Sequence, residues 1–161
     1  MSFDNDKLRA QFLANLGDVY HAMNKFTESD SAYDRSLKFD AENSYVLNNY
    51  SYYLSIRKVN LEKAKQMSAY SNKLDPGNTS FLDTYAWILF QLNDFAGAKE
   101  WQQKAMNAGG DKSGTILEHY GDILFKLGNK DEALNYWKQA KALGTDSTTI
   151  DRKIAEMKYV E

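Results

Sequence analysis

The chain has 161 residues, a single proline and an apolar fraction of 43%, which suits one mostly helical domain with a sizeable core. Its formal net charge of −2 excludes a global attraction to nucleic acid or to anionic lipid. Cysteine is absent, so thiol chemistry is excluded, and no apolar stretch reaches the roughly 18 residues that a membrane span needs.

Helical spacing of apolar residues predicts nine helices in chain order, separated by short turns. They cover residues 7–23, 26–39, 44–56, 60–73, 79–92, 95–108, 114–127, 130–143 and 148–158. The turn chemistry is clearest at Asp75-Pro76-Gly77-Asn78, where Pro fixes φ and its neighbours accept tight-turn geometry. One extra residue is expected in the turn around Lys58-Val59-Asn60, and no linker separates the units.

A motif of eight residues recurs in the odd-numbered helices up to residue 124; its first copy reads Leu13-x-x-Leu16-Gly17-x-x-Tyr20. The small residues at its fifth position are spaced by 34, 35 and 35 residues; they are Gly17, Ser51, Ala86 and Gly121. This period is typical of a solenoid of helix pairs. A mid-helix glycine costs roughly 0.5–1 kcal/mol relative to alanine, so Gly17 and Gly121 predict that a second helix crosses closely.

The second helices extend the match. Ala133, Trp137 and Ala140 follow the last copy of the motif at the offsets of the tetratricopeptide repeat (TPR) family, and Pro76 stands where that family closes a repeat. The sequence therefore resembles TPR proteins over about residues 10–145, and the run Leu47–Leu54 resembles the C-terminal part of bacterial multi-TPR proteins. This resemblance implies an all-α fold, a right-handed α-solenoid of four TPR-like helix pairs plus a C-terminal capping helix.

We expect a single TPR domain over residues 1–161, with repeats at about 10–43, 44–78, 79–113 and 114–147 and a capping helix at 148–158. The sequence Thr148-x-x-Asp151 resembles a capping box at the start of that last helix. Apolar residues then follow at helical spacing, Ile150, Ile154 and Met157, with polar residues such as Lys153 on the opposite side. One buried face and one exposed face are what the end of a solenoid needs.

The residues give no support to catalysis, a cofactor or a metal site. His21 and His119 do not stand in a metal-binding or general-base motif, and the glycine-rich segment at 109–115 lacks the lysine that a phosphate loop requires. We therefore expect a protein that is not an enzyme and uses no cofactor. A solenoid offers an extended groove instead, which favours a macromolecular partner.

In the TPR family the groove is lined by the first helix of each pair, on the side away from the second helix. The resemblance gives that role to Asp18, Tyr45, Asn48, Asn49, Tyr52, Asp83, Trp87, Phe90, Glu118, Asp122 and Phe125. Large rings on a solvent-facing side are typical of binding hot spots. The alternative is that the C-terminal helix or tight curvature covers some of these rings, so that they belong to the core.

Of the family's clamp for a peptide carboxylate only Asn49 is present, and Asp18 would repel such a group. The acidic groove positions instead predict a protein or peptide segment that carries Lys or Arg together with an apolar or aromatic anchor. We expect no nucleic acid partner and no membrane insertion by this chain.

Two other classes of function stay open. A self-assembly module would associate through the N-terminal face, where Phe3, Leu8 and Phe12 lie, and a cell-envelope module would stack sugars on rings such as Trp87. The first residues do not resemble a secretory signal. The compartment is unknown: we expect the cytoplasm from this chain alone, and the periplasm or cell envelope if the chain is cut from a longer exported protein.

Overall fold

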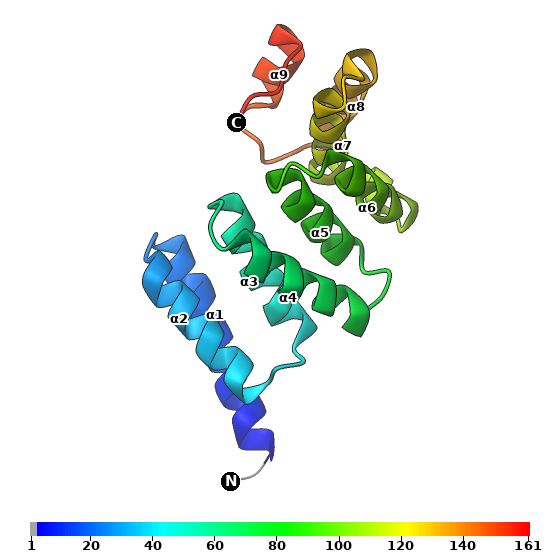
Figure 1. Ribbon diagram of the computed structural model, residues 1–161. Helices are drawn as coiled ribbons and strands as arrows, with labels where there is room; N and C mark the ends of the chain where they lie inside the picture. The colour runs from blue at the N-terminus through cyan, green and yellow to red at the C-terminus, as the bar shows by residue number, and fades with distance from the viewer. Residues whose placement is uncertain (1–2) are drawn as a thin grey trace. The chain divides into compact units, whose positions relative to one another are not determined.

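The computed structural model describes residues 3–161, and every regular element in that range is helical: nine α-helices and one short 3₁₀ helix (Figure 1). This confirms the all-α fold class. The side chain of Phe3 lies outside the described part. The chain divides into two compact units, residues 1–75 and 76–161, which meet at the predicted turn around Pro76. No helix described here has the length and apolarity to span a bilayer.

The first unit contains two helix pairs: α1 (Phe3–Ala22) with α2 (Phe26–Phe39), and α3 (Ser44–Ile56) with α4 (Leu61–Leu74). In the first pair, small side chains of α2 bind the backbone of α1 directly. Ser29 Oγ donates to the carbonyl oxygen of Gly17 at 2.8 Å, and Ser36 Oγ donates to that of Ala10 at 2.7 Å. These hydrogen bonds join the two helices at their crossing, which gives Ser29 and Ser36 a structural role.

The extra residue in the turn between α3 and α4 is confirmed by the backbone. Lys58 and Asn60 both adopt positive φ, 55° and 48°, whereas the corresponding turns after α1 and α5 each contain one such residue, Asn24 and Asn93. Asparagine tolerates the left-handed region better than most residues because its short side chain bonds to the nearby backbone.

The second unit contains two further helix pairs and a terminal helix: α5 (Thr79–Gln91), α6 (Phe95–Asn107), the 3₁₀ helix η1 (Gly110–Lys112), α7 (Gly114–Lys126), α8 (Lys130–Leu143) and α9 (Ile150–Glu156). Side chains cap three of these helices by accepting a hydrogen bond from the backbone N–H three residues on; they are Asn78, Asp94 and Ser113. Such caps satisfy N–H groups that the first helical turn cannot.

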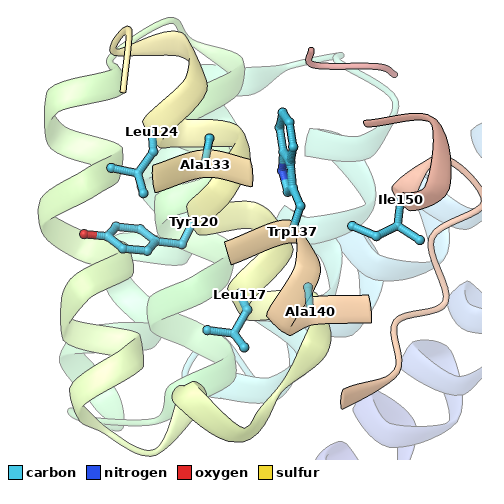
Figure 2. Packing of buried hydrophobic residues seen from close by; sticks show 7 residues of the cluster. All are labelled: Leu117, Tyr120, Leu124, Ala133, Trp137, Ala140 and Ile150. Atoms are coloured by element: carbon cyan, nitrogen blue, oxygen red, sulfur yellow. The ribbon is translucent and has the colours of Figure 1, made fainter. Parts of the chain in front are cut away.

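The core of the fourth pair forms where α8 crosses the motif of α7. Figure 2 shows the cluster, which consists of Leu117, Tyr120, Leu124, Ala133, Trp137, Ala140 and Ile150. Trp137 is fully buried, and its indole lies so close to Gly121 that an added Cβ would stand 2.5 Å from Trp137 Cδ1. The predicted reason for a small residue at this position is therefore confirmed.

The last helix is shorter than predicted. It begins at Ile150 rather than at residue 148, its N-cap Thr149 makes no side-chain cap hydrogen bond, and Met157 ends it with φ 49°. The predicted faces were partly wrong, because Met157 is 50% exposed and Lys153 only 4% exposed. Lys153 lies three residues after Ile150 and one before Ile154, so helical geometry places it on the face that packs inward.

Candidate partner-binding surfaces

In the first unit, one side of α3 carries polar and aromatic side chains. Tyr45 is 63% exposed, Tyr52 is 37% exposed, and Asn49 between them is also exposed. Their spacing of three to four residues puts them on one side of the helix, while Tyr50 and Leu54 are buried on the other. These three predicted groove residues therefore share a surface that a partner can reach.

Asn48 does not belong to this exposed strip, because it is only 6% exposed. Its side-chain amide donates to Asn49 Oδ1 at 3.4 Å. Asn48 is therefore placed to orient the Asn49 amide rather than to meet a partner directly.

Asp18 on α1 is held by two tyrosines. Its carboxylate accepts hydrogen bonds from the hydroxyl of Tyr33 and, at 3.2 Å, from that of Tyr53. Burial, together with this carboxylate, raises the pKa of Tyr53 above its ordinary value of 10.0. Tyr53 in turn stacks on His21 with ring centroids 3.7 Å apart. Asp18 therefore ties α1, α2 and α3 together, a role that the motif did not reveal.

In the second unit, α5 and α7 present a stack of three rings. Trp87 lies parallel to Phe90 at 4.7 Å and to His119 at 4.1 Å between ring centroids. His119 Nδ1 lies 2.9 Å from Asp83 Oδ1, and the same oxygen accepts a hydrogen bond from Gln102 Nε2 at 2.6 Å. Two predicted groove residues, Asp83 and Trp87, are thus brought together by His119.

The protonation of His119 depends on this geometry. Burial opposes the charged form, but the Asp83 carboxylate more than offsets it by charge and hydrogen bonding, so the pKa of His119 lies above its ordinary value of 6.5. The imidazolium form is thereby favoured in the folded state. Charged His119 and Asp83 form an ion pair, and the His119 ring of that pair stacks on Trp87.

Glu118 and Asp122, expected as exposed groove acids, are buried instead, with 4% and 1% exposed. Their charge is met by Lys153 of α9, whose Nζ donates to Glu118 Oε1 at 2.7 Å and to Asp122 Oδ2 at 2.8 Å. Thr145 Oγ1 also donates to Glu118 at 2.8 Å, and Trp137 Nε1 donates to Asp122 at 2.9 Å. The expectation that these two acids face solvent is therefore wrong, because the C-terminal segment covers them.

The two acids respond differently to this environment. Burial raises the pKa of Asp122 to about 6, although Lys153 and His119 pull it down. At Glu118, burial acts in the same upward sense, but hydrogen bonding and charge from Lys153 outweigh it and the pKa lies below its ordinary value of 4.5. Glu118 is thus the more firmly ionised partner of the lysine.

The remaining two rings also contact other parts of the second unit. Phe90 is 4% exposed and meets the edge of Tyr159 at a centroid distance of 5.6 Å. Phe125 packs beside Trp137 at 5.7 Å. Phe90 is thus covered by the C-terminal segment, as the alternative in the sequence analysis stated. Phe125 instead packs between α7 and α8.

Comparison with known proteins agrees with the fold. The tetratricopeptide repeat family model matches residues 10–43 and 115–143. PilF of Pseudomonas aeruginosa is 21% identical with a TM-score of 0.73, over 92% of this chain and 71% of that one. PilW, described as a widely conserved type IV pilus biogenesis factor, is 12% identical with a TM-score of 0.78, over 92% and 70%.

YrrB, described as a TPR protein with an unusual peptide-binding site, is 15% identical with a TM-score of 0.66, over 90% of this chain and 74% of that one. Among curated proteins no match is found. The fold and the two matched repeats define a helical-repeat protein with the architecture of TPR solenoids. Two segments of the chain match the TPR family and its fold is that of TPR solenoids of known structure; TPR proteins generally act as non-catalytic scaffolds that bind protein or peptide partners.

Proposed function

We propose that this chain is a non-catalytic scaffold that holds a partner segment on the first helices of its repeats, with a surface on each of its two units. The observation that carries the proposal is the exposed strip of α3, on which Tyr45, Asn49 and Tyr52 lie opposite the buried motif residues. Tyrosine supplies large contact area at low entropic cost, and an asparagine amide both donates to and accepts from a peptide backbone.

The second unit supports the same reading through its stacked rings. Trp87 is partly buried between Phe90 and His119, so its ring is held in place before any partner arrives. Pre-organised rings lose little freedom on binding. Asp83, with 13% of its side chain exposed, places a carboxylate beside the stack, where a partner's cation would share it with His119. We therefore propose a partner that presents an apolar or aromatic anchor next to Lys or Arg. The peptide-binding site named for YrrB makes a peptide segment a reasonable choice.

Selection of a random peptide library on the full chain tests this function. We expect enriched peptides to combine Lys or Arg with a large apolar or aromatic residue. Trp87→Ala or Tyr52→Ala should weaken their binding by about 1–3 kcal/mol, since truncation of a ring at a hot spot removes contact that water cannot replace. The measurement is the Kd of a selected peptide by fluorescence anisotropy.

Tyr70→Ala is the matched control. Tyr70 is also a tyrosine of the first unit, but it lies on the second helix of its pair and its hydroxyl donates to Glu42 at 2.9 Å. Its loss should leave the Kd unchanged. Selected peptides that bind all three variants as tightly as the wild type would exclude the first-helix surfaces.

Self-assembly is the second candidate, and one observation favours it. Leu8, Phe12 and Phe39 are 70%, 66% and 40% exposed, and together with Leu13 they line one hollow on α1 and α2. A monomer rarely exposes several large apolar side chains side by side. The glycan-binding alternative stays a prediction.

A further inference from the structure

The C-terminal segment, residues 145–161, packs Ile150 against the core of α7 and α8 and places two further side chains on α7 and α5 in the way that a bound peptide would. Lys153 inserts its ammonium between Glu118 and Asp122, and Tyr159 sets its ring against Phe90. A cation and an aromatic anchor are the chemistry that the groove positions predict for a partner. The chain thus carries, on its own C-terminal segment, the features expected of its ligand.

Besides Lys153 and Tyr159, three residues hold this segment: Ile150 packs with Trp137 and Ala140, Thr145 donates to Glu118, and Asp151 pairs with Lys141 at 2.7 Å. Its helix α9 has seven residues, too few to be stable alone in water. Only Ile150 and Lys153 are fully buried between residues 145 and 161, while Ile154 and Tyr159 are partly buried. The order of the segment therefore depends on its docking, and a competitor that takes the lysine and tyrosine positions removes the segment's contacts with Glu118, Asp122 and Phe90.

The lysine site favours recognition more than stability. Moving an ammonium and two carboxylates out of water costs about as much as their mutual attraction returns, so a buried ionic group of this kind adds little net stability. It does select strongly, because two buried carboxylates without a cation are unfavourable and a neutral or acidic side chain is rejected. The site is built to require a cation, whichever chain supplies it.

We propose that residues 145–161 are an intramolecular ligand, and that the same site on α5 and α7 accepts a partner's segment with a lysine and, six positions further on, an aromatic residue. The proposal rests on the scaffold function above and specifies its partner for the second unit. Binding then requires that the partner displaces α9. The C-terminal segment therefore determines how high the partner's concentration must be before it occupies this surface.

A labelled peptide with the sequence of residues 147–161 tests the competition on the full chain. The wild type should bind it weakly, because its own segment fills the site. The variant Lys153→Ala should bind it at least about tenfold more tightly, since the apparent Kd scales inversely with the fraction of chains whose site is vacant. Fluorescence anisotropy gives both Kd values.

Two controls define the site. Lys158→Ala in the chain removes an exposed lysine that pairs with Glu156 of the same segment, and it should leave the Kd at the wild-type value. A peptide whose own lysine, the counterpart of Lys153, is replaced by alanine should fail to bind the Lys153→Ala chain. Should Lys153→Ala lose its helical circular dichroism, Tyr159→Ala, which keeps both ion pairs, replaces it under the same tenfold criterion.

The outcomes separate this inference from the scaffold function. Equal peptide affinity in the wild type and in a folded Lys153→Ala chain overturns the inference. A wild-type mass that doubles without peptide and returns to that of one chain in Tyr159→Ala also overturns it, because the segment then passes between two copies. The scaffold function is judged independently. Library peptides whose affinity falls in Tyr52→Ala but is unchanged in Lys153→Ala would support the scaffold function and contradict the inference.

Discussion

His21 and His119 lie in the first and fourth repeats, yet their surroundings shift them in opposite directions. Burial and the nearby Arg57 lower the pKa of His21 below its ordinary value of 6.5. At His119, burial acts in the same sense, but the Asp83 carboxylate outweighs it and the pKa is raised. Folding therefore favours a neutral imidazole in the first unit and a charged one in the second.

These directions predict opposite pH dependences of stability. The contribution of His119 is fully present below pH 6.5 and is lost as the pH rises through its raised folded-state pKa. Relative to His119→Gln, the wild type should therefore lose stability between about pH 6 and about pH 8. Urea unfolding at both pH values measures this difference. A constant gap between the two proteins would mean that Asp83 and His119 do not form an ion pair in solution.

His21 gives the reciprocal measurement. Its contribution is present above pH 6.5 and is lost as the pH falls through its lowered folded-state pKa. Relative to His21→Gln, the wild type should become less stable as the pH falls below that value. The two variants thus control for each other, because a general acid effect would move both in the same direction.

Sequence reasoning placed the acids and the lysine of the candidate site in the right helices but on the wrong faces. The spacing of Ile150 and Ile154 already puts Lys153 on their side of α9, so the signal was present. The sequence nevertheless predicts an exposed lysine, because lysine side chains in folded proteins are rarely buried. The burial of Glu118 and Asp122 carried no local signal, since it depends on a segment about 30 residues further along the chain.

At the level of the helices, the repeat motif predicted the helix pairs because its recurring positions are residues that pack against the second helix of the same pair. Gly17 faces the ring of Tyr33 and Gly121 faces that of Trp137, each across one helix crossing. The terminal helix has no such repeated partner, so its predicted bounds were less accurate. The helix begins after Thr149 and ends at Met157, whose φ is positive, and the periodic pattern of apolar residues identifies neither boundary.

Gly121→Leu should lower the free energy of unfolding by roughly 2–4 kcal/mol, because even the Cβ would overlap the fully buried Trp137 ring and the core must shift to admit the rest. Ala142→Leu is the matched control: it adds a leucine at an exposed position of α8 and should be nearly neutral. Thermal or urea unfolding compares them. Equal stability of the two variants would contradict the close crossing of α7 and α8.

At the level of the whole chain, each unit serves a different part of the proposed function. The first unit keeps its aromatic strip on α3 exposed, whereas the second covers its lysine site with residues 145–161. Both follow the same repeat motif, so the motif alone predicts the fold but does not distinguish an open surface from an occupied one. That distinction arises from the residues outside the repeats.

The apolar face of α1 and α2 gives the last prediction. With Leu8 and Phe12 about two-thirds exposed, contact between two copies through this face removes apolar area from water at roughly 25 cal/mol per Å². The mass measured by light scattering should therefore rise above that of one chain as the concentration increases. Phe12→Lys should suppress the rise, because a buried unpaired ammonium opposes association. Lys7→Ala, at an exposed neighbouring position, should not suppress it. If the wild-type mass stays at that of one chain throughout, this face does not drive self-assembly, and the scaffold function stands without it.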